Sequence, residues 1–406
     1  LGLDSEALSA LKRAAWGYAW KSAALQQAAE IDCRLGDLVT AAEDLEASLE
    51  TNAHSLRGKS QRAAIRRRQG RTEEPRESAR AMLAYDPLDS ASLFTLYLCG
   101  EEDAGKELVS ILGSKTGAYL DLAETYLSAG LWAEGRKALE LCPNHTALSR
   151  FYQAWTANQL GDQAGCAAAL EQGEGAPQEG VFPNRPFDFQ VLEFAAEQGG
   201  GALAPYYLGC MYYARSNEVP AVDWWQCAAR RRPDFADPHR ALAQALFEYY
   251  QDRAAAKAEM DQALACSREP RIFYESYQLA KALGVSSQER LAMLESNRDL
   301  VDKRQDLVLQ YIELLCRVGR LREAKELLDH GAFYCYEGGE GHLPNLHAFV
   351  HTSLGMEALK QGKAQEALDL FRFACEYPAQ YHEGRRYQDR DAHLRYYLAL
   401  GYEAVG

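Results

Sequence analysis

The sequence predicts an all-α fold in which helix-turn-helix repeats stack into a right-handed superhelix, an α-solenoid. Three observations predict this fold. A set of glycine, alanine, aromatic and proline positions recurs along the chain. Glycines fall between pairs of helical segments, as at Gly36 and Gly70, which are 34 residues apart. The chain also has 406 residues, more than one compact domain usually holds, so it must divide or extend as an array.

The amino-acid composition excludes some classes of binding partner and favours one cellular compartment. The formal net charge of -14 disfavours nucleic acid and anionic membranes as partners. The basic run from Gln61 to Arg71 is followed at once by acids, and we interpret it as a solvated helix face. Ten scattered cysteines without a CxxC pair favour a reducing, cytoplasmic compartment and disfavour zinc or a disulfide framework.

Two further expectations concern targeting and the start of the chain. The sequence shows no apolar run of about eighteen residues and no basic segment leading into a short apolar one, so we expect neither a membrane span nor a signal peptide. Because the chain begins with Leu1, we expect it to be part of a longer protein.

The N-terminal part, residues 1–175, is predicted to hold degenerate helical repeats. Weak copies such as "DCRLGDLVTAAEDL" and "FYQAWTANQLGDQAGCAAAL" place Gly36 and Gly161 in turns. Residues 176–190 are predicted to be a glycine- and proline-rich linker or long loop, and we place the main boundary within residues 171–188. The sequence leaves open whether this segment is a loop inside one superhelix or a hinge between two.

Residues 191–406 carry the clearer repeats. In the copy that starts at Leu203, Gly209 lets two helices approach, Trp225 lies on the second helix and Pro233 ends it. A second copy follows from Asp237. A third, "HTSLGMEALKQGKAQEALDLFRFACEYP", has Gly355, Ala367, Phe371 and Pro378 at the same mutual spacing. One helix pair cannot bury its apolar face alone, so neighbouring pairs must stack on it.

These spacings match the tetratricopeptide-repeat (TPR) pattern. The C-terminal portion also resembles the TPR region of large bacterial proteins that carry an upstream domain of unknown function, the 5107 family, through "YYLGCMYY", "YEGGEGHLPN" and "GRRYQDRDAHLRYYLALGYEA". The resemblance to TPR proteins implies binding of a protein or peptide segment in a concave groove lined by the first helix of each repeat. The resemblance to the bacterial family implies a parent protein whose upstream domain acts on carbohydrate.

Side chains on the first helices are therefore expected to form the groove. Aromatic residues and arginine are common anchors of recognition surfaces, although each tyrosine could equally serve inter-helix packing. The predicted groove residues are Tyr206, Tyr213, Glu248, Tyr249, Tyr274, Gln278, Glu313, Arg317 and Lys360.

An inserted loop at residues 331–346 interrupts the array before the third clear copy. Such insertions are often docking surfaces, and a structured loop whose glycines supply turns is the alternative. The predicted docking residues are Tyr334, Tyr336, Glu337, Glu340 and His342. His347 and His351, four residues apart, would share a helix face and raise a metal hypothesis. Since HExxH order and a cysteine pair are both missing, we predict no metal and no cofactor.

The sequence predicts no catalytic site of its own. We find no GxSxG, no GxxxxGK[ST] and no GxGxxG after a strand. The predicted function is a cytoplasmic, non-catalytic scaffold that binds a protein, a peptide or the upstream domain of its own parent chain. The alternative is an accessory arm of a carbohydrate-active enzyme that completes the site of that upstream domain.

Overall fold

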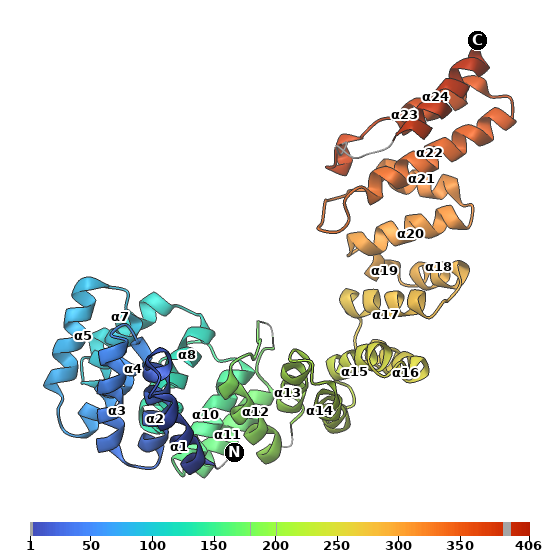
Figure 1. Cartoon of the computed structure of the whole chain (residues 1–406). Helices are drawn as coiled ribbons and strands as arrows, with labels where there is room; N and C mark the ends of the chain where they lie inside the picture. Colours follow the sequence, from blue (N-terminus) through green and yellow to red (C-terminus); the bar gives the residue numbers. More distant parts are fainter. Residues whose placement is uncertain (1–2, 179, 200, 385–390) are drawn as a thin grey trace. The chain divides into compact units, whose positions relative to one another are not determined.

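The structure is a computed structural model that describes residues 3–178, 180–199, 201–384 and 391–406. It divides into two compact units, Leu1–Pro233 and Asp234–Gly406. Within the described residues every regular element is a helix, so the predicted all-α class is confirmed (Figure 1).

The N-terminal unit contains helices α1 (Asp4–Ala14), α2 (Tyr18–Arg34), α3 (Leu38–Thr51), α4 (Leu56–Arg68), α5 (Glu73–Tyr85), α6 (Ser90–Leu98), α7 (Glu102–Leu112), α8 (Thr116–Leu127), α9 (Trp132–Glu140), α10 (Ala147–Gln159), α11 (Gln163–Glu174), α12 (Pro186–Gln198), α13 (Leu203–Tyr213) and α14 (Glu218–Arg231). The C-terminal unit contains α15 (Ala236–Glu248), α16 (Arg253–Cys266), α17 (Pro270–Ala282), α18 (Ser287–Glu295), α19 (Arg298–Val301), α20 (Gln305–Arg317), α21 (Leu321–His330), α22 (His342–Lys360), α23 (Ala364–Ala374), the 3₁₀ turn Ala379–Tyr381 and α24 (Ala392–Val405).

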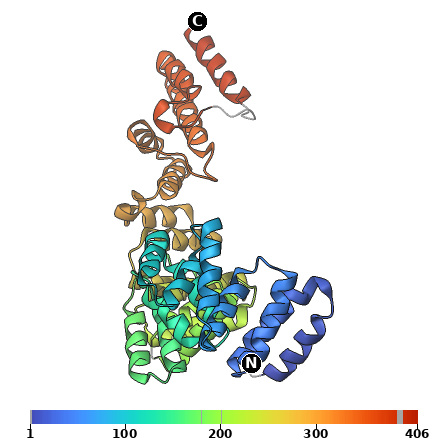
Figure 2. The ribbon, with the colours of Figure 1, turned by 90° about the vertical axis from the view of Figure 1, so that its left-hand side faces the viewer.

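Consecutive helices in each unit form hairpins with tight turns. In most of them a glycine with positive φ follows the first helix, a conformation that costs glycine little and other residues more. These glycines are Gly36, Gly70, Gly100, Gly130, Gly161, Gly284, Gly319 and Gly362. Ser216 and Gln251, with φ of 54° and 56°, occupy the same place between α13 and α14 and between α15 and α16. The ribbons of paired helices lie side by side in both views of the chain (Figures 1 and 2).

Glycines inside the first helices allow the close approach that the sequence predicts. A Cβ atom on Gly209 of α13 would lie 2.4 Å from the ring of Trp225 of α14. A Cβ atom on Gly355 of α22 would lie 2.4 Å from the ring of Phe371 of α23. Both distances are shorter than atoms tolerate, so each glycine is required by the ring of the partner helix.

The N-terminal unit departs from simple stacking of neighbouring repeats. Helix α8 packs against α4, although three helices separate them in the chain. Arg67 and Arg68 of α4 form ion pairs with Glu134 of α9, whose side chain is buried. These arginines belong to the basic run that we interpreted as a solvated face. That interpretation was wrong for the part that faces α9, because the buried carboxylate of Glu134 pairs with two of the five arginines, while residues 68–71 are exposed as expected.

The segment at 171–188 lies within the N-terminal unit, whereas the contacts divide the chain between Pro233 and Asp234. The hydroxyl of Tyr152 donates to the buried carboxylate of Asp188 at 2.6 Å, so α12 is bonded back to α10. Arg185 reaches Asp121 of α8 at 2.6 Å. Polar contacts of this kind are invisible in a glycine- and proline-rich composition, and they tie the segment to the helices that precede it.

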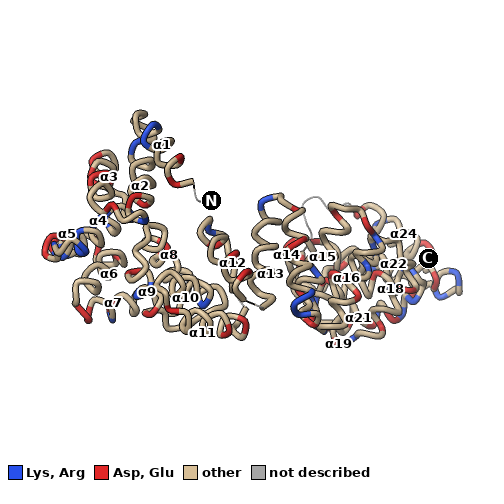
Figure 3. Tube along the Cα trace, turned by 90° about the horizontal axis from the view of Figure 1, so that it is seen from below, with Lys and Arg blue, Asp and Glu red and all other residues tan. Residues whose placement is uncertain are grey.

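The C-terminal unit has a continuous core built from α17 to α22 and the turn at Tyr381. No helix among the residues that the structure describes combines the length and the apolar character needed to cross a membrane. Lysine, arginine, aspartate and glutamate are mixed along the helices, as the coloured tube shows (Figure 3).

Candidate functional site

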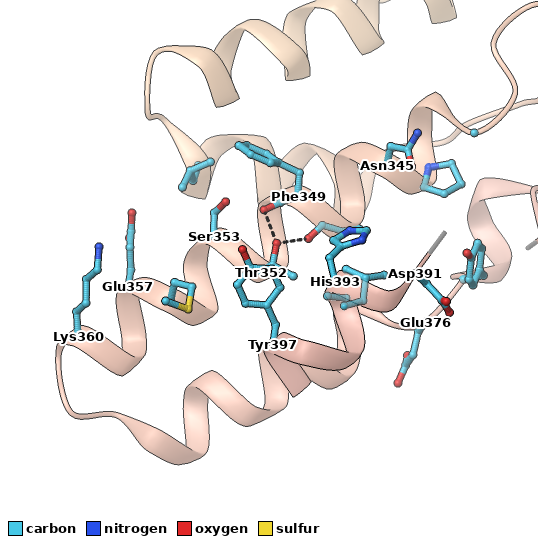
Figure 4. A pocket seen from close by; sticks show the side chains of 18 residues that line it. Asn345, Phe349, Thr352, Ser353, Glu357, Lys360, Glu376, Asp391, His393 and Tyr397 are labelled. Atoms are coloured by element: carbon cyan, nitrogen blue, oxygen red, sulfur yellow. Dashed lines mark hydrogen bonds between the residues drawn. The ribbon is translucent and has the colours of Figure 1, made fainter. Parts of the chain in front are cut away.

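The C-terminal unit has a groove of about 620 Å³ between α22 and α24 (Figure 4). Helix α22 provides most of its length, the segment after α23 forms one end, and α24 forms the far wall. We call it the α22–α24 groove. Its side chains include Asn345, Phe349, Thr352, Ser353, Met356, Glu357, Lys360, Glu376, Tyr377, Asp391, His393, Leu394 and Tyr397.

Helix α22 begins before the helix that the repeat pattern predicts, and its added residues Pro344, Asn345, Ala348 and Phe349 extend the groove. Gly341 precedes the helix with a φ of 77°, and Pro344 falls in its first turn, where a missing N–H costs nothing. Asn345, Phe349 and Ser353 are spaced by four residues and therefore share one face of the helix. The face extends from Asn345 to Lys360, about 22 Å at 1.5 Å per residue.

The lining combines apolar anchors with hydrogen-bonding groups. Phe349 of α22 is 51% exposed, and Leu394 and Tyr397 belong to the wall that α24 provides. The hydroxyl of Thr352 donates to the carbonyl oxygen of Ala348 at 2.7 Å, so it is satisfied within the helix. Charged groups occur at the two ends, with Lys360 at one and Glu376 at the other. An exposed ring between polar ends suits an extended chain with an apolar side chain at its centre.

A second hollow, of about 340 Å³, lies between α15 and α17. It brings together Glu248 and Gln278, two of the predicted groove residues, around an apolar floor that includes Phe247 and Met260. The two residues come from the first helices of consecutive repeats, as the repeat pattern predicts for an inner face.

The tyrosines among the predicted groove residues lie in other surroundings. The ring of Tyr213 packs 5.3 Å from that of Trp225, and Tyr206 accepts the Trp225 indole N–H through its carbonyl oxygen. Tyr249 is an exposed residue at the end of α15, beside the ring of Tyr250. The guanidinium of Arg304 lies 4.7 Å from the ring centre of Tyr274. Packing thus accounts for Tyr213 and Tyr274, and binding by all four stays a prediction.

Glu313 and Arg317 form an ion pair along α20 at 2.6 Å. His342, a predicted loop residue, lies 3.7 Å from the other oxygen of Glu313. The structure thus joins a predicted groove residue to a predicted docking residue. Lys360, the last of the predicted groove residues, lines the α22–α24 groove.

The inserted loop is shorter than predicted. Residues 342–346 are helical, so the loop ends at Gly341, and His342 is the first residue of α22. The periodic apolar residues Leu343, Leu346 and Val350 continue the helix backwards, and they are all buried. The prediction of a loop to residue 346 was wrong. It gave more weight to the glycines before this segment than to the helical spacing of the segment's apolar residues.

The remaining loop is held against the core at several points. Phe333 is buried with its ring 5.5 Å from that of Tyr381, and the hydroxyl of Tyr334 accepts the backbone N–H of Gln305 at 3.2 Å. Tyr336 lies against Gly339, and burial raises the pKa of its phenol. Glu337 and Glu340 are exposed. Docking by these residues stays a prediction, with Tyr334 and the two glutamates as the exposed part.

The two histidines of the metal hypothesis are buried in the C-terminal core. His347 bonds to Tyr381 and to the carbonyl oxygen of Phe373, so both of its ring nitrogens are occupied. In the part of the chain that the structure describes, no group of three or more His, Cys, Asp or Glu side chains is placed to hold a metal ion. None of the ten cysteines, all of which the structure describes, forms a disulfide.

Sequence reasoning missed several groove residues, chiefly Asn345, Phe349, His393 and Tyr397. Asn345 fell in the predicted loop to residue 346, and Phe349 fell between that loop and the third copy, which began at His351. The apolar spacing from Leu343 onwards could have revealed them. His393 and Tyr397 belong to α24, which follows the last full repeat and was not assigned a groove position.

No family model matches the chain. Several solved structures of TPR proteins are similar to the chain over different shares of its length. YrrB, a TPR protein with an unusual peptide-binding site, is 15% identical over 46% of this chain and 91% of its own, with a TM-score of 0.34. The C-terminal part of a TPR repeat-containing protein from Cytophaga hutchinsonii is 12% identical over 62% and 92%, with a TM-score of 0.35. Yeast Tom70 is 13% identical over 99% and 92%, with a TM-score of 0.30. At these scores the likeness carries no argument about a site, and the fold rests on the helix pairs described above.

Proposed function

We propose that this chain is a non-catalytic helical-repeat scaffold that binds a segment of another polypeptide in the α22–α24 groove. The observation that carries the proposal is the groove itself, in which one continuous face of α22 leaves Phe349 half exposed. An exposed aromatic ring inside a hollow is an unused anchor, because burying it against a partner removes apolar surface from water.

The dimensions of the groove favour a short extended segment. At about 3.3 Å per residue, a length of about 22 Å accommodates roughly six or seven extended residues. The lining favours a segment with a large apolar side chain near its centre and polar residues at its ends. We further propose that the chain acts in the cytoplasm, a reducing compartment that suits ten cysteines without a disulfide.

Interdomain docking through the loop is the finer part of the proposal. Glu337 and Glu340 are its exposed charged groups, and they would face a basic surface on the upstream domain of the parent protein. The accessory-arm alternative uses the same loop. It predicts that the separately expressed upstream domain binds the chain and that the variant Glu337→Gln with Glu340→Gln loses this binding.

A random heptapeptide library displayed on phage tests the groove directly. We expect selection on the full chain to enrich peptides with a central aromatic or aliphatic residue. In the variant Ser353→Trp the new side chain fills the groove from α22. We therefore expect the enriched peptides not to bind this variant. Enrichment that is equal on the unchanged chain and on Ser353→Trp would contradict the proposal.

Gln365→Trp is the matched control, because Gln365 is an exposed residue of α23 that does not line the groove. It adds the same ring to the same hairpin. The control should retain the selected peptides. Loss of binding in both variants would point to a general effect of the added tryptophan and would also contradict the groove as the binding site.

A further inference from the structure

The N-terminal unit contains a hollow of about 290 Å³ among α4, α5 and α6, which the proposed function does not use. We call it the α4–α6 hollow. Helix α4 lines it with three cationic side chains, those of Lys59, Arg62 and Arg66. These residues are spaced by three and four positions, so they share one face of the helix. The two arginines belong to the basic run from Gln61 to Arg71.

The hollow lies where the second helix of this hairpin carries a small side chain. Ten hairpins have a turn residue with positive φ, namely the eight glycines, Ser216 and Gln251 given above. Nine positions after that residue, the α4–α5 hairpin carries Ala79, whereas the other nine hairpins carry a large apolar residue. Those residues are Leu45, Val109, Leu139, Leu170, Trp225, Met260, Met293, Leu328 and Phe371. Ala79 is buried and lines the hollow, which is the space that a larger side chain fills in the other hairpins.

The three cations also stand where another first helix presents buried apolar and aromatic residues. They precede the turn residue Gly70 by eleven, eight and four positions. Helix α8 ends at the turn residue Gly130, and its buried residues at the same three positions are Tyr119, Leu122 and Tyr126. Withdrawing a cation from water costs free energy unless an opposite charge meets it. A cationic face inside a helix hairpin is therefore expected to have an anionic partner.

Acids of the chain balance only part of this positive charge. The carboxylate of Glu46 forms an ion pair with Nη2 of Arg66. The Nε atom of Arg66 is buried, lies 3.9 Å from Glu74 and has no hydrogen-bond partner among the residues that the structure describes. Within the described ranges, no carboxylate forms an ion pair with Lys59 or Arg62.

The acids that line the hollow leave the charge of these two residues unbalanced. Asp89 accepts the backbone N–H of Ser92 at 3.0 Å and so caps the first turn of α6. The side chain of Glu74 is 50% exposed, and the cation that it approaches is Arg66. Lys59 and Arg62 thus remain for a ligand, and together they balance two negative charges.

We propose that the α4–α6 hollow binds a small organic anion with two negative charges, either a phosphate monoester or a dicarboxylate. The guanidinium of Arg62 presents parallel N–H donors that match the oxygens of both groups, and the ammonium of Lys59 supplies the second positive charge. Ala63, Ala79 and Met82 provide apolar surface for the carbon atoms of the ligand. The volume is at the lower end of the usual range for small-molecule sites, so the ligand is small.

Isothermal titration calorimetry of the full chain at pH 7.5 tests the site with two probes, glycerol phosphate and succinate. We expect at least one of them to bind at low ionic strength, with an affinity that falls as sodium chloride is added. The probe that binds more tightly identifies the preferred anionic group. Uncharged glycerol should not bind. Failure of both probes to bind, or an affinity that salt leaves unchanged, would overturn the proposal.

Arg62→Gln tests whether the cations hold the anion. This variant removes one charge and the paired donors, so the affinity for the bound probe should fall at least about tenfold. Arg71→Gln is the matched control, because Arg71 is an exposed arginine of the same basic run that does not line the hollow. It should bind the probe as the unchanged chain does. Equal affinities of the two variants would contradict the assigned role of Arg62.

Ala79→Leu tests the hollow itself. Leucine is the residue at this position in four of the other hairpins, those with Leu45, Leu139, Leu170 and Leu328, so the variant should keep its helical circular dichroism and its thermal transition. It should no longer bind the probe, because the new side chain occupies the space. Ala84→Leu is the control, at an exposed residue of α5 outside the lining, and should retain binding. A folded Ala79→Leu that binds as tightly as the unchanged chain would place the anion elsewhere.

Discussion

In two repeats a glycine on the first helix lies directly against a large ring on the second. Such pairs were predictable from the sequence, because the spacing of Gly209 to Trp225 recurs between Gly355 and Phe371. The distances show why the pattern is strict, since a single added carbon atom at either glycine would overlap the ring.

Gly209→Ala should therefore destabilise the N-terminal unit. The new Cβ would lie 2.4 Å from the Trp225 ring, and overpacking of this kind costs about 1–3 kcal/mol. Gly117→Ala is the control, because its Cβ would meet only the end of the Arg185 side chain at 3.7 Å. There the better helix propensity of alanine should leave stability equal or higher. Urea unfolding measures both, and equal midpoints for the two variants would refute the packing argument.

Glu134 is a residue that the sequence analysis passed over. Burial alone would raise the pKa of this carboxyl, but the hydrogen bond and charge of Arg68 outweigh it and hold the pKa below its usual value. The sequence could not show this partner, because 66 residues separate Arg68 from Glu134. Ion pairs between distant helices follow from the tertiary arrangement, and the local pattern does not contain them.

Removing that carboxylate should destabilise the N-terminal unit strongly. Glu134→Ala leaves Arg67 and Arg68 without their buried partner, at a cost of about 2–4 kcal/mol in the free energy of unfolding. Glu140→Ala removes an exposed acid of the same helix, and its pair with Arg136 contributes less than about 1 kcal/mol. Thermal unfolding compares the two variants. A similar small effect in both would mean that the buried pair contributes little.

At the scale of the element, α22 shows where sequence patterns succeeded and where they misled. The third repeat was predicted from Gly355, Ala367 and Phe371, and the structure places these residues at the contact of α22 with α23. The beginning of the helix was misplaced because four glycines precede it. Apolar periodicity was the better guide to this boundary, and the groove face was missed together with it.

The burial of His347 in α22 predicts that the free energy of unfolding depends on pH. The pKa of His347 is about 4 in the folded chain and about 6.5 in an unfolded one, so the unfolded chain binds the proton first as pH falls. The contribution of the neutral ring is fully present above about pH 6.5 and is lost progressively towards pH 4. At pH 5 the expected loss is about 2 kcal/mol.

Urea unfolding of the C-terminal unit at pH 7.5 and pH 5 measures this loss. His347→Gln cannot take up the proton, so the difference in unfolding free energy between the two pH values should shrink. His330→Gln should retain the full difference, because this histidine is exposed. If both variants behave alike, His347 is not the group responsible.

At the scale of the whole molecule, the all-α class followed from the sequence, whereas the division of the chain did not. Glycine and proline content pointed to residues 171–188, and the contacts divide the chain at Pro233 and Asp234. The reason is that Asp188 and Arg185 bond to helices on the N-terminal side. Prolines follow other helices of the array as well, so Pro233 did not mark the boundary between the two units.

Each unit has its own buried core, so each should fold alone. We expect residues 1–233 and 234–406, expressed separately, to show helical circular dichroism and a cooperative thermal transition. A fragment cut at residue 180 should fold less well than one cut at 233, because it loses the Tyr152–Asp188 bond. The reverse order of stability would favour the boundary predicted from composition.

The affinity of a library-selected peptide for three forms of the full chain tests the central claim most directly. The forms are the unchanged chain, Ser353→Trp and Gln365→Trp, compared by fluorescence anisotropy at one ionic strength and pH 7.5. We predict that Ser353→Trp weakens binding at least about tenfold, which corresponds to about 1.4 kcal/mol, and that Gln365→Trp leaves it unchanged. Equal affinity for all three forms would show that the α22–α24 groove is not where this protein binds its partner.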